Sequence, residues 1–366
     1  MSIFPTITNL DEFRQAVGEV PGIEFRTNDD GFTVASYYII ESSMFRNEYA
    51  RECRGITFDS TGKLVCRPFH KFFNLNENER TQERDLDWSL VHTVMDKRDG
   101  SMITPVLIDA DTIAYKTKRT FTSNEARIAQ TNFGYLTPQY MFSLHYCKLG
   151  FTPIFELTSP SNRIVVPYNV AELTLLAIRN IETGEYLSRH EIEAIAEEWN
   201  VPIVATFNEL YNEQGITPFK DQIENATFIE GFVVQFNDGE MLKMKTLWYL
   251  SLHHTVTFTT EKNIAEMVLD NTVDDFKSYC NWADNTALYD KVCEIETRVV
   301  STLNEIIDTV DNTVANCNCG TPKEFALTYQ DHIYFHLLIA KFRGLKPDYA
   351  KFFKTNHLFE YSTECV

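Results

Sequence analysis

Apolar and polar residues alternate in short runs along much of the chain between residues 23 and 250. A period of two is typical of strands that bury one face. Turn residues separate the runs, as at Asp59-Ser60-Thr61-Gly62 and Asn237-Asp238-Gly239. We therefore expect largely antiparallel sheets here. The predicted strands include RGITFD (54–59), LVCRPF (64–69), SMITPVLI (101–108), TIAYKTK (112–118), TPIFEL (152–157), ELTLLAI (172–178), FIEGFVVQF (228–236) and EMLKMKT (240–246).

Helical periodicity interrupts the strands once clearly and dominates the last third of the chain. In LSRHEIEAIAEEWN (187–200), Ser188 followed by Glu191 is typical of a capping box at a helix start. A second helical run is expected at 323–342, after a break at Gly320-Thr321-Pro322. The pattern predicts an α+β fold: an antiparallel-sheet domain at 1–255 and an all-helical C-terminal domain at 256–366. The longest helix is indicated by apolar residues three or four apart, at Leu288, Val292, Ile295, Val299, Leu303, Ile306 and Val310.

Composition limits the possible functions. No run of about 18 apolar residues occurs, so we expect no membrane segment and a cytoplasmic protein. The eight cysteines show no paired zinc spacing, and free thiols are expected. A net charge of −19 argues against coating nucleic acid by bulk positive charge. The basic segment 341–354 departs from this trend and is either a phosphate-contacting patch or a solvated helix face.

Familiar nucleotide motifs are absent from the sequence. No two glycines stand two positions apart, and Gly62-Lys63 is followed by leucine, so neither a dinucleotide fingerprint nor a P-loop is present. His332 and His336 stand four apart on a predicted helix, but a structural or solvent-facing pair is a better interpretation than zinc ligands.

Lys97 is the first candidate for chemistry. It lies two residues before Asp99-Gly100, which permits a tight turn, and apolar strand formers flank it. A free lysine has a pKa of about 10.4, so use as a nucleophile requires nearby cations or desolvation. The pattern K-x-D-G alone occurs by chance in many proteins, so Lys97 needs support from the rest of the chain.

Charged residues in a particular order give that support. In EMLKMKT, Lys243 and Lys245 alternate with apolar residues, so a strand would direct both amines to one face, where they suit a triphosphate. Glu156 and Glu230 lie in predicted strands and are expected to be partly buried, which requires polar partners. Arg54 in RECRGITF and Lys71 in HKFFN complete the set.

With these residues the chain resembles the covalent nucleotidyltransferases, and most closely the bacteriophage RNA ligase 1 family of tRNA-repair ligases. The matching motifs are KRDGS from Lys97, FEL around Glu156, EGFVV from Glu230 and KMK from Lys243. The segments ECRG, KFFNLNE, SPSNRIV and WYLSLH strengthen the resemblance. It implies an ATP-grasp-like adenylyltransferase domain. The helical end of the chain favours the RNA ligase branch, because related DNA ligases and capping enzymes usually carry an OB-fold barrel there.

The resemblance implies a three-step, ATP-dependent ligation. Lys97 would take AMP covalently from ATP, pass it to an RNA 5′-phosphate, and a 3′-hydroxyl would then displace it. Mg²⁺ or Mn²⁺ is the implied cofactor. By family position, Arg54, Lys71, Lys243 and Lys245 would contact phosphates. Glu156 would hold the ribose and Glu230 would bind or orient the metal.

Further site residues carry over less directly. Tyr37, Lys118 and Tyr249 are candidate contacts to the triphosphate or the adenosine. Asp274 and Asp275, in VDDF, are either metal ligands or an acidic pair at a helix start.

The implied substrate is RNA, in particular tRNA broken in its anticodon loop, recognised by the helical domain of a monomer. That domain is otherwise a structural buttress. A polynucleotide kinase-phosphatase would prepare the ends. Two alternatives stay open, a GTP-dependent capping-type nucleotidyltransferase and a catalytically idle ligase fold that binds RNA.

Overall fold

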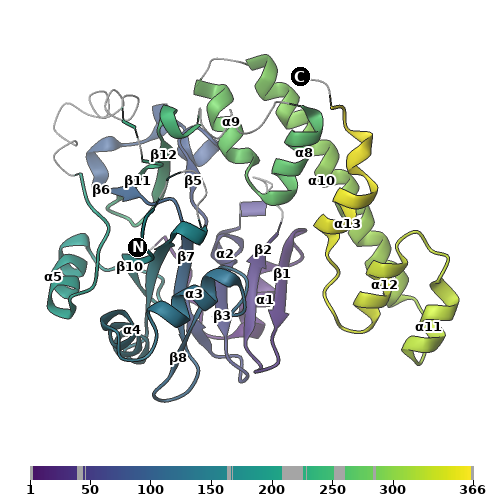
Figure 1. Ribbon diagram of the computed structural model, residues 1–366, viewed down its shortest axis with the longest axis horizontal. Helices are drawn as coiled ribbons and strands as arrows, with labels where there is room; N and C mark the ends of the chain where they lie inside the picture. Colours follow the sequence, from purple (N-terminus) through teal and green to yellow (C-terminus); the bar gives the residue numbers. More distant parts are fainter. Residues whose placement is uncertain are drawn as a thin grey trace. The chain divides into compact units, whose positions relative to one another are not determined.

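The computed structural model describes residues 3–38, 44–45, 47–162, 166, 168–207, 226–227, 229–250, 260–282 and 286–363. The chain divides into two compact units, Met1–His253 and His254–Val366, and the sequence predicts the boundary between residues 255 and 256. Figure 1 shows strands and helices in the first unit and the helices from α8 onward in the second. The predicted α+β class, with antiparallel sheets and a helical C-terminal region, is confirmed.

Within the described residues, the strands of the first unit form three four-stranded sheets. The first sheet has the order β1-β2-β3-β4, the second β10-β9-β7-β8 and the third β5-β12-β11-β6. Strand pairing is antiparallel except between β5 and β12. The strands are β1 (Ile23–Thr27), β2 (Thr33–Tyr37), β3 (Arg54–Phe58), β4 (Leu64–Cys66), β5 (Phe73–Asn74), β6 (Val91–Lys97), β7 (Ser101–Leu107), β8 (Ile113–Lys116), β9 (Phe151–Thr158), β10 (Glu172–Asn180), β11 (Gly231–Phe236) and β12 (Met241–Lys245).

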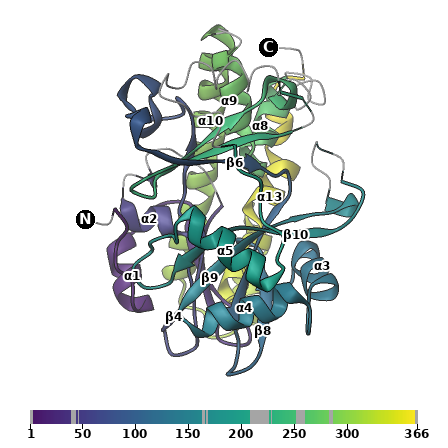
Figure 2. The ribbon, with the colours of Figure 1, turned by 90° about the vertical axis from the view of Figure 1, so that its left-hand side faces the viewer.

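Helices of the first unit cover one face of its first two sheets. Phe13 packs with Ile56 of the first sheet, while Phe142 and Ile192 pack with Phe155 of the second. In Figure 2, α4 and α5 face the viewer over β9 and β10. Ser188 caps α5 with Glu191 in the predicted capping box. The helices are α1 (Leu10–Val17), α2 (Glu48–Glu52), α3 (Asn124–Asn132), α4 (Pro138–Lys148) and α5 (Arg189–Trp199).

The chain crosses from the third sheet to the second immediately after Lys97. β6 ends at Lys97 and β7 begins at Ser101, yet the two strands belong to different sheets. Asp99 and Gly100 form the bend at which the chain makes this crossing. Gly100 is needed there because a Cβ would collide with the carbonyl oxygen of Leu157 on the neighbouring β9.

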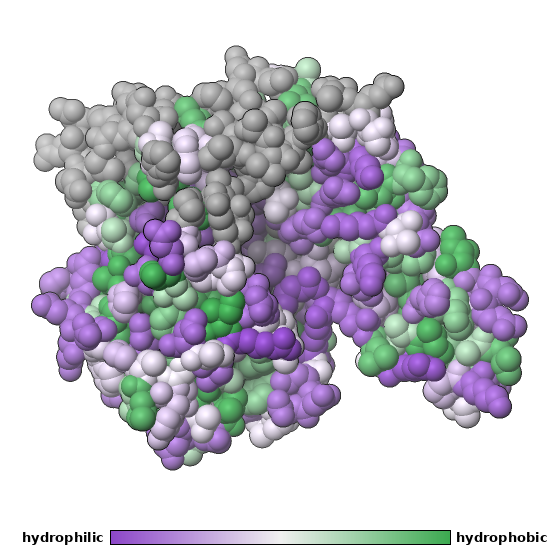
Figure 3. Space-filling view, in the orientation of Figure 1, coloured by the Kyte–Doolittle hydropathy of each residue, from purple (hydrophilic) through white to green (hydrophobic). Residues whose placement is uncertain are grey.

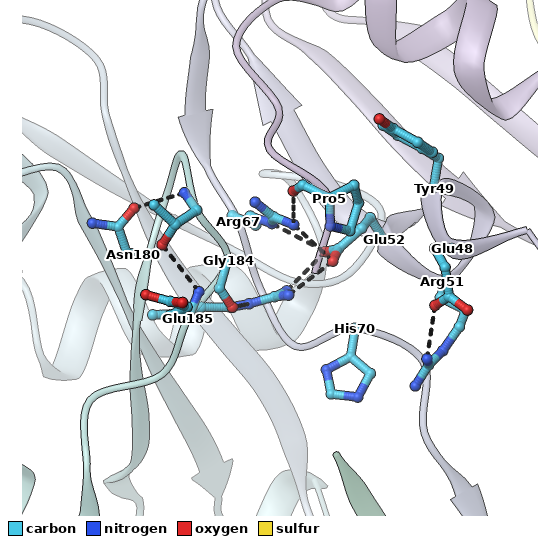
Figure 4. A network of polar contacts seen from close by, with 12 residues as sticks. Pro5, Glu48, Tyr49, Arg51, Glu52, Arg67, His70, Asn180, Gly184 and Glu185 are labelled. Atoms are coloured by element: carbon cyan, nitrogen blue, oxygen red, sulfur yellow. Dashed lines mark hydrogen bonds and ion pairs between the residues drawn. The ribbon is translucent and has the colours of Figure 1, made fainter. Parts of the chain in front are cut away.

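A buried ion network stabilises the first unit (Figure 4). Arg67 and Arg179 each donate hydrogen bonds to both carboxylate oxygens of Glu52, at 2.8 to 3.2 Å. Their other N–H groups reach backbone carbonyls, including those of Pro5 and Gly184. Burial alone would raise the pKa of Glu52, but the two guanidinium groups hold it below its usual value. The network ties α2 to β10 and to the N-terminal segment.

The second unit consists of helices arranged around α10. Buried residues of α10 include six of the predicted apolar positions, from Val292 to Val310, so the predicted long helix is confirmed. The single run predicted at 323–342 is wrong, because a turn separates α11 from α12 and places His332 outside both helices. The helices are α8 (Glu261–Asp270), α9 (Val273–Trp282), α10 (Thr286–Ala315), α11 (Pro322–Tyr329), α12 (Phe335–Phe342) and α13 (Tyr349–Asn356).

The surface of this second unit is mixed in character. Leu327, Ile333 and Leu345 are 64%, 71% and 61% exposed, on or beside α11 and α12. Figure 3 shows apolar and polar residues interspersed over these helices. Among the described residues, no helix is long and apolar enough to cross a membrane, and the described cysteines are free thiols.

We expect Glu52→Gln to lower the free energy of unfolding by about 3 to 5 kcal/mol, because it leaves two buried guanidinium groups without their anion. Urea denaturation measures this, with Glu197→Gln on the exposed face of α5 as the control. Since the pKa of Glu52 is lowered in the folded state, its contribution is present above the pKa of an unfolded glutamate and is lost as pH falls. The difference between wild type and Glu52→Gln should therefore shrink in acid. A difference independent of pH would contradict the role assigned to this charge.

Candidate active site

A pocket lies between the second and third sheets of the first unit. It encloses about 790 Å³ free of atoms, its open mouth included. Met95, Lys97, Val233 and Lys243 come from the third sheet, and Met102, Glu156 and Leu176 from the second. The other lining residues are Arg54, Phe69, Phe72, Asp96, Arg98, Gly100 and Val204.

Strand register explains why Lys97, Glu230 and Lys245 meet. β11 lies between β6 and β12, and its first residue, Gly231, pairs with Lys97 on one side and Lys245 on the other. Residues paired in this way point to the same face, and glycine places no side chain between the two lysines. Lys97 Nζ and Lys245 Nζ lie 2.6 Å and 2.8 Å from Glu230 Oε1. Glu230, predicted inside the strand, lies immediately before it.

The carboxylate of Glu230 is buried and its side chain is only 4% exposed. Burial alone would raise its pKa, but Lys245 and Lys97 hold the pKa below the usual value. Glu230 therefore stays ionised and fixes both amines. The side chain of Lys97 is 21% exposed at the pocket, so its amine is held in place yet accessible.

Alternation along β12 places its lysines as the sequence pattern predicts. Leu242 and Met244 belong to the apolar cluster on one face of the third sheet. Lys243 lines the pocket on the other face, and Lys245 reaches Glu230.

Glu156 lines the pocket from the second sheet, where it pairs with Met102 of β7 and Thr174 of β10. Burial raises its pKa to about 8, with the nearby charge of Glu230 adding to the effect and that of Lys97 opposing it. At neutral pH this carboxyl is therefore mostly protonated. A neutral carboxyl can both donate and accept a hydrogen bond, as a ribose hydroxyl requires.

Four cations surround the buried phenol of Tyr37. Lys118 Nζ lies 4.0 Å and Lys71 Nζ 5.8 Å from the centre of its ring. Burial would raise the pKa of Tyr37, but the charges of Lys118, Lys71, Arg54 and Lys243 lower it to about 8. The structure thus brings together five of the residues predicted to contact ATP. Such a concentration of positive charge suits a polyphosphate.

Tyr249 is buried beside the pocket residues, and Lys245 Nζ lies 4.8 Å from the centre of its ring. Its hydroxyl donates to Asp99 Oδ1 at 3.0 Å, and its contact with the triphosphate or the adenosine stays a prediction. The backbone N–H of Val166 donates to Asp99 Oδ2 at 2.7 Å. Asp99 therefore anchors the crossing segment that follows Lys97. The Asp-Gly pair was the only sequence signal for this anchor, and its partners are distant along the chain.

Phe72 and Arg98 line the pocket and were not predicted as site residues, although they lie in the segments KFFNLNE and KRDGS. The Arg54 guanidinium lies over the Phe72 ring, 5.0 Å from its centre. Arg98 lies over the Tyr168 ring and is paired with Glu172. Their roles depend on neighbours that only the fold supplies.

Asp274 and Asp275 belong to the second unit, in the first turn of α9. Their use as metal ligands stays a prediction. The described part of the chain contains no group of three or more His, Cys, Asp or Glu side chains that could hold a metal ion.

Similarity to known proteins identifies the family. Residues 52–249 match the family model described as RNA ligase, and this stretch includes Lys97, Glu156, Glu230 and Lys245. A putative RNA ligase of Thermovibrio ammonificans is 31% identical over 277 residues, covering 71% of this chain and 70% of that protein. The chain belongs to the RNA ligase family. The predicted family, and with it the prediction of a ligase, are confirmed.

Two further relatives of this RNA ligase are less similar to it, and the chain matches different shares of their lengths. RNA ligase 1 of bacteriophage TS2126 is 25% identical over 244 residues, 62% of this chain and 58% of that protein. A putative bifunctional polynucleotide kinase/RNA ligase of Autographa californica nuclear polyhedrosis virus is 27% identical over 250 residues, 62% of this chain and 34% of that protein.

We expect the stability of the RNA ligase to fall, relative to Glu156→Gln, as pH rises from about 4.5 to about 8. The folded pKa of Glu156 is raised from 4.5 to about 8, so between these values the folded chain keeps a proton that the unfolded chain has lost. Urea denaturation at a series of pH values measures the difference, which should level off above pH 8. A constant difference across the series would contradict the raised pKa.

Proposed function

We propose that this RNA ligase joins 5′-phosphate and 3′-hydroxyl RNA ends through AMP carried on Lys97. The observation that supports it most is the placement of the Lys97 amine. It lies at the wall of a pocket, held by Glu230 beside Lys245, with Glu156 and a cationic cluster in the same pocket region.

In the first step, Lys97 Nζ as a free amine attacks the α-phosphorus of ATP. The new N–P bond forms as the bond to the bridging oxygen breaks, pyrophosphate leaves and the amine proton passes to solvent. An oxygen of the RNA 5′-phosphate then attacks the AMP phosphorus and Lys97 leaves as an amine. Finally the RNA 3′-hydroxyl attacks the activated 5′-phosphate, AMP departs and the phosphodiester is complete. Positioning and charge neutralisation would carry most of the catalysis.

The surrounding residues have distinct proposed roles. Lys243 and Lys245 stabilise charge at the α-phosphate and the leaving pyrophosphate. Arg54, Lys71 and Lys118 bind the remaining phosphates beside Tyr37. Glu156 bonds the ribose. Tyr249 holds Asp99 and so fixes the segment after Lys97.

A divalent cation, Mg²⁺ or Mn²⁺, would neutralise phosphate charge. Glu230, whose carboxylate contacts both lysine amines, is the residue that would hold this cation through water. One carboxylate fits Mg²⁺, which usually keeps several waters and takes other ligands from phosphates.

The proposed substrate is RNA broken in a tRNA anticodon loop, with ends prepared by a polynucleotide kinase-phosphatase. A relative named as bifunctional polynucleotide kinase/RNA ligase supports a kinase as partner. In the basic segment 341–354, Lys341 and Lys354 pair with Asp311 and Asp270. Arg343 and Lys351 are exposed and are therefore the proposed contacts to RNA phosphates.

The nucleotide test uses α-labelled ATP or GTP with Mg²⁺. We expect acid-labile, alkali-stable labelling from ATP, complete loss of label in Lys97→Ala and normal labelling in Lys148→Ala, whose lysine lies on the surface of α4. Label from GTP alone would indicate a capping-type enzyme. No label from either nucleotide would indicate an idle RNA-binding fold, and both results would refute the proposal.

The RNA test uses the double variant Arg343→Ala/Lys351→Ala. Loss of two phosphate contacts should weaken binding of a nicked anticodon stem-loop and lower the slope of log affinity against log salt by about one to two. Labelling of Lys97 should be unchanged. Lys323→Ala, an exposed lysine at the start of α11, is the control. Equal RNA binding by the double variant and the control would exclude the segment from recognition.

A further inference from the structure

Arg51 and Glu240 form an ion pair that joins α2 to the segment just before β12. Arg51 lies in α2 and its side chain is 3% exposed, while Glu240 immediately precedes β12. Arg51 Nη1 and Nη2 donate to Glu240 Oε1 and Oε2, each at 2.6 Å. Two parallel hydrogen bonds between planar groups fix orientation as well as distance. The pair therefore sets how α2 and the start of β12 lie relative to each other.

Arg51 also fixes the backbone at Lys71. The N–H of Lys71 donates to the carbonyl oxygen of Arg51 at 2.7 Å, and Arg51 Nε donates to the carbonyl oxygen of Lys71 at 3.2 Å. The residues that follow, Phe73 and Asn74, pair with Leu242 and Lys243 of β12. The segment that carries Lys71 is thus hydrogen-bonded to Arg51 on one side and paired with β12, which follows Glu240, on the other.

Arg54 depends on the same contacts. It lies three positions after Arg51, and its Nη1 donates to the carbonyl oxygen of His70 at 3.3 Å. The ring of His70 is buried, with Nδ1 2.9 Å from the hydroxyl of Tyr186 and Nε2 3.5 Å from Glu240 Oε2. The positions of Arg54, Lys71 and Lys243 therefore all depend on contacts around the Arg51–Glu240 pair.

We infer that the Arg51–Glu240 pair is a positioning device that spaces the phosphate-binding cations Arg54, Lys71 and Lys243. These cations repel one another, so a fixed frame must hold them together before a polyphosphate arrives. The bidentate pair supplies that frame by joining α2, the Lys71 segment and β12. Neither Arg51 nor Glu240 lines the pocket, so both act through the cations. The inference rests on the proposed use of ATP.

This positioning role has a consequence that general structural support lacks. Misplaced cations weaken contacts to phosphates, whereas the adenosine part of the nucleotide is not held by them. Loss of the pair should therefore reduce affinity for ATP far more than affinity for adenosine. General loosening of the fold would weaken both ligands to a similar extent.

The experiment measures binding of ATP and of adenosine by calorimetry in the full chain carrying Lys97→Ala, which prevents covalent transfer. Adding Glu240→Gln should weaken ATP at least tenfold and adenosine less than twofold. Glu48→Gln is the matched control, because Glu48 also accepts a hydrogen bond from Arg51, at 2.9 Å, but from the same helix α2. It should leave both affinities unchanged.

A second variant keeps the inference testable if Glu240→Gln fails to fold. Arg51→Lys keeps the charge but loses the paired geometry and the bond from Nε to Lys71, so it should show the same selective loss of ATP. Equal weakening of ATP and adenosine, or unchanged ATP binding in both variants, would overturn the inference. Failure of the Lys97→Ala parent to bind ATP at all would instead overturn the proposed function.

Discussion

The structure of the pocket depends on one buried carboxylate shared by two amines. Glu230 holds Lys97 and Lys245 at 2.6 Å and 2.8 Å, and these lysines come from strands on opposite sides of β11. A buried carboxylate without partners would be strongly disfavoured, and two ammonium groups this close would repel each other without it. The requirement is mutual, so strand register, charge and the position of the amine are specified together.

Charge is distributed unevenly in this acidic chain. The net charge is −19, yet cations gather around Tyr37 and line the pocket. Carboxylates that lie outside the pocket make this possible. Glu52 holds Arg67 and Arg179, and Glu240 holds Arg51, so the arginines next to the site can be buried without losing their partners. Anions outside the pocket thus stabilise the local excess of positive charge inside it.

Two groups in the site are close to changing charge at neutral pH. The pKa of Glu156 is raised to about 8 by burial, and the pKa of Tyr37 is lowered to about 8 by four cations. Opposite causes bring a carboxyl and a phenol to the same range. Both would therefore respond to the arrival of a polyanion, which stabilises protonated forms nearby.

Patterns in the sequence determined many of the strands and helices and named the candidate residues for chemistry. Alternation fixed the face of Lys243, spacing at three and four residues predicted α10, and the Ser188 cap marked the start of α5. Ordered motifs identified the family. Each of these signals depends on residue types and their spacing along the chain, so the sequence alone carries it.

Tertiary structure decided which residues meet. Gly231 stands between Lys97 and Lys245 only because β11 pairs with both neighbours in one register. Arg51 and Glu240 are 189 positions apart, and Asp99 and Tyr249 are 150 apart. No short-range pattern marks such pairs, because their partners are chosen by how sheets and helices pack. For the same reason Asp99-Gly100, which resembles a turn in sequence, became a crossing between two sheets.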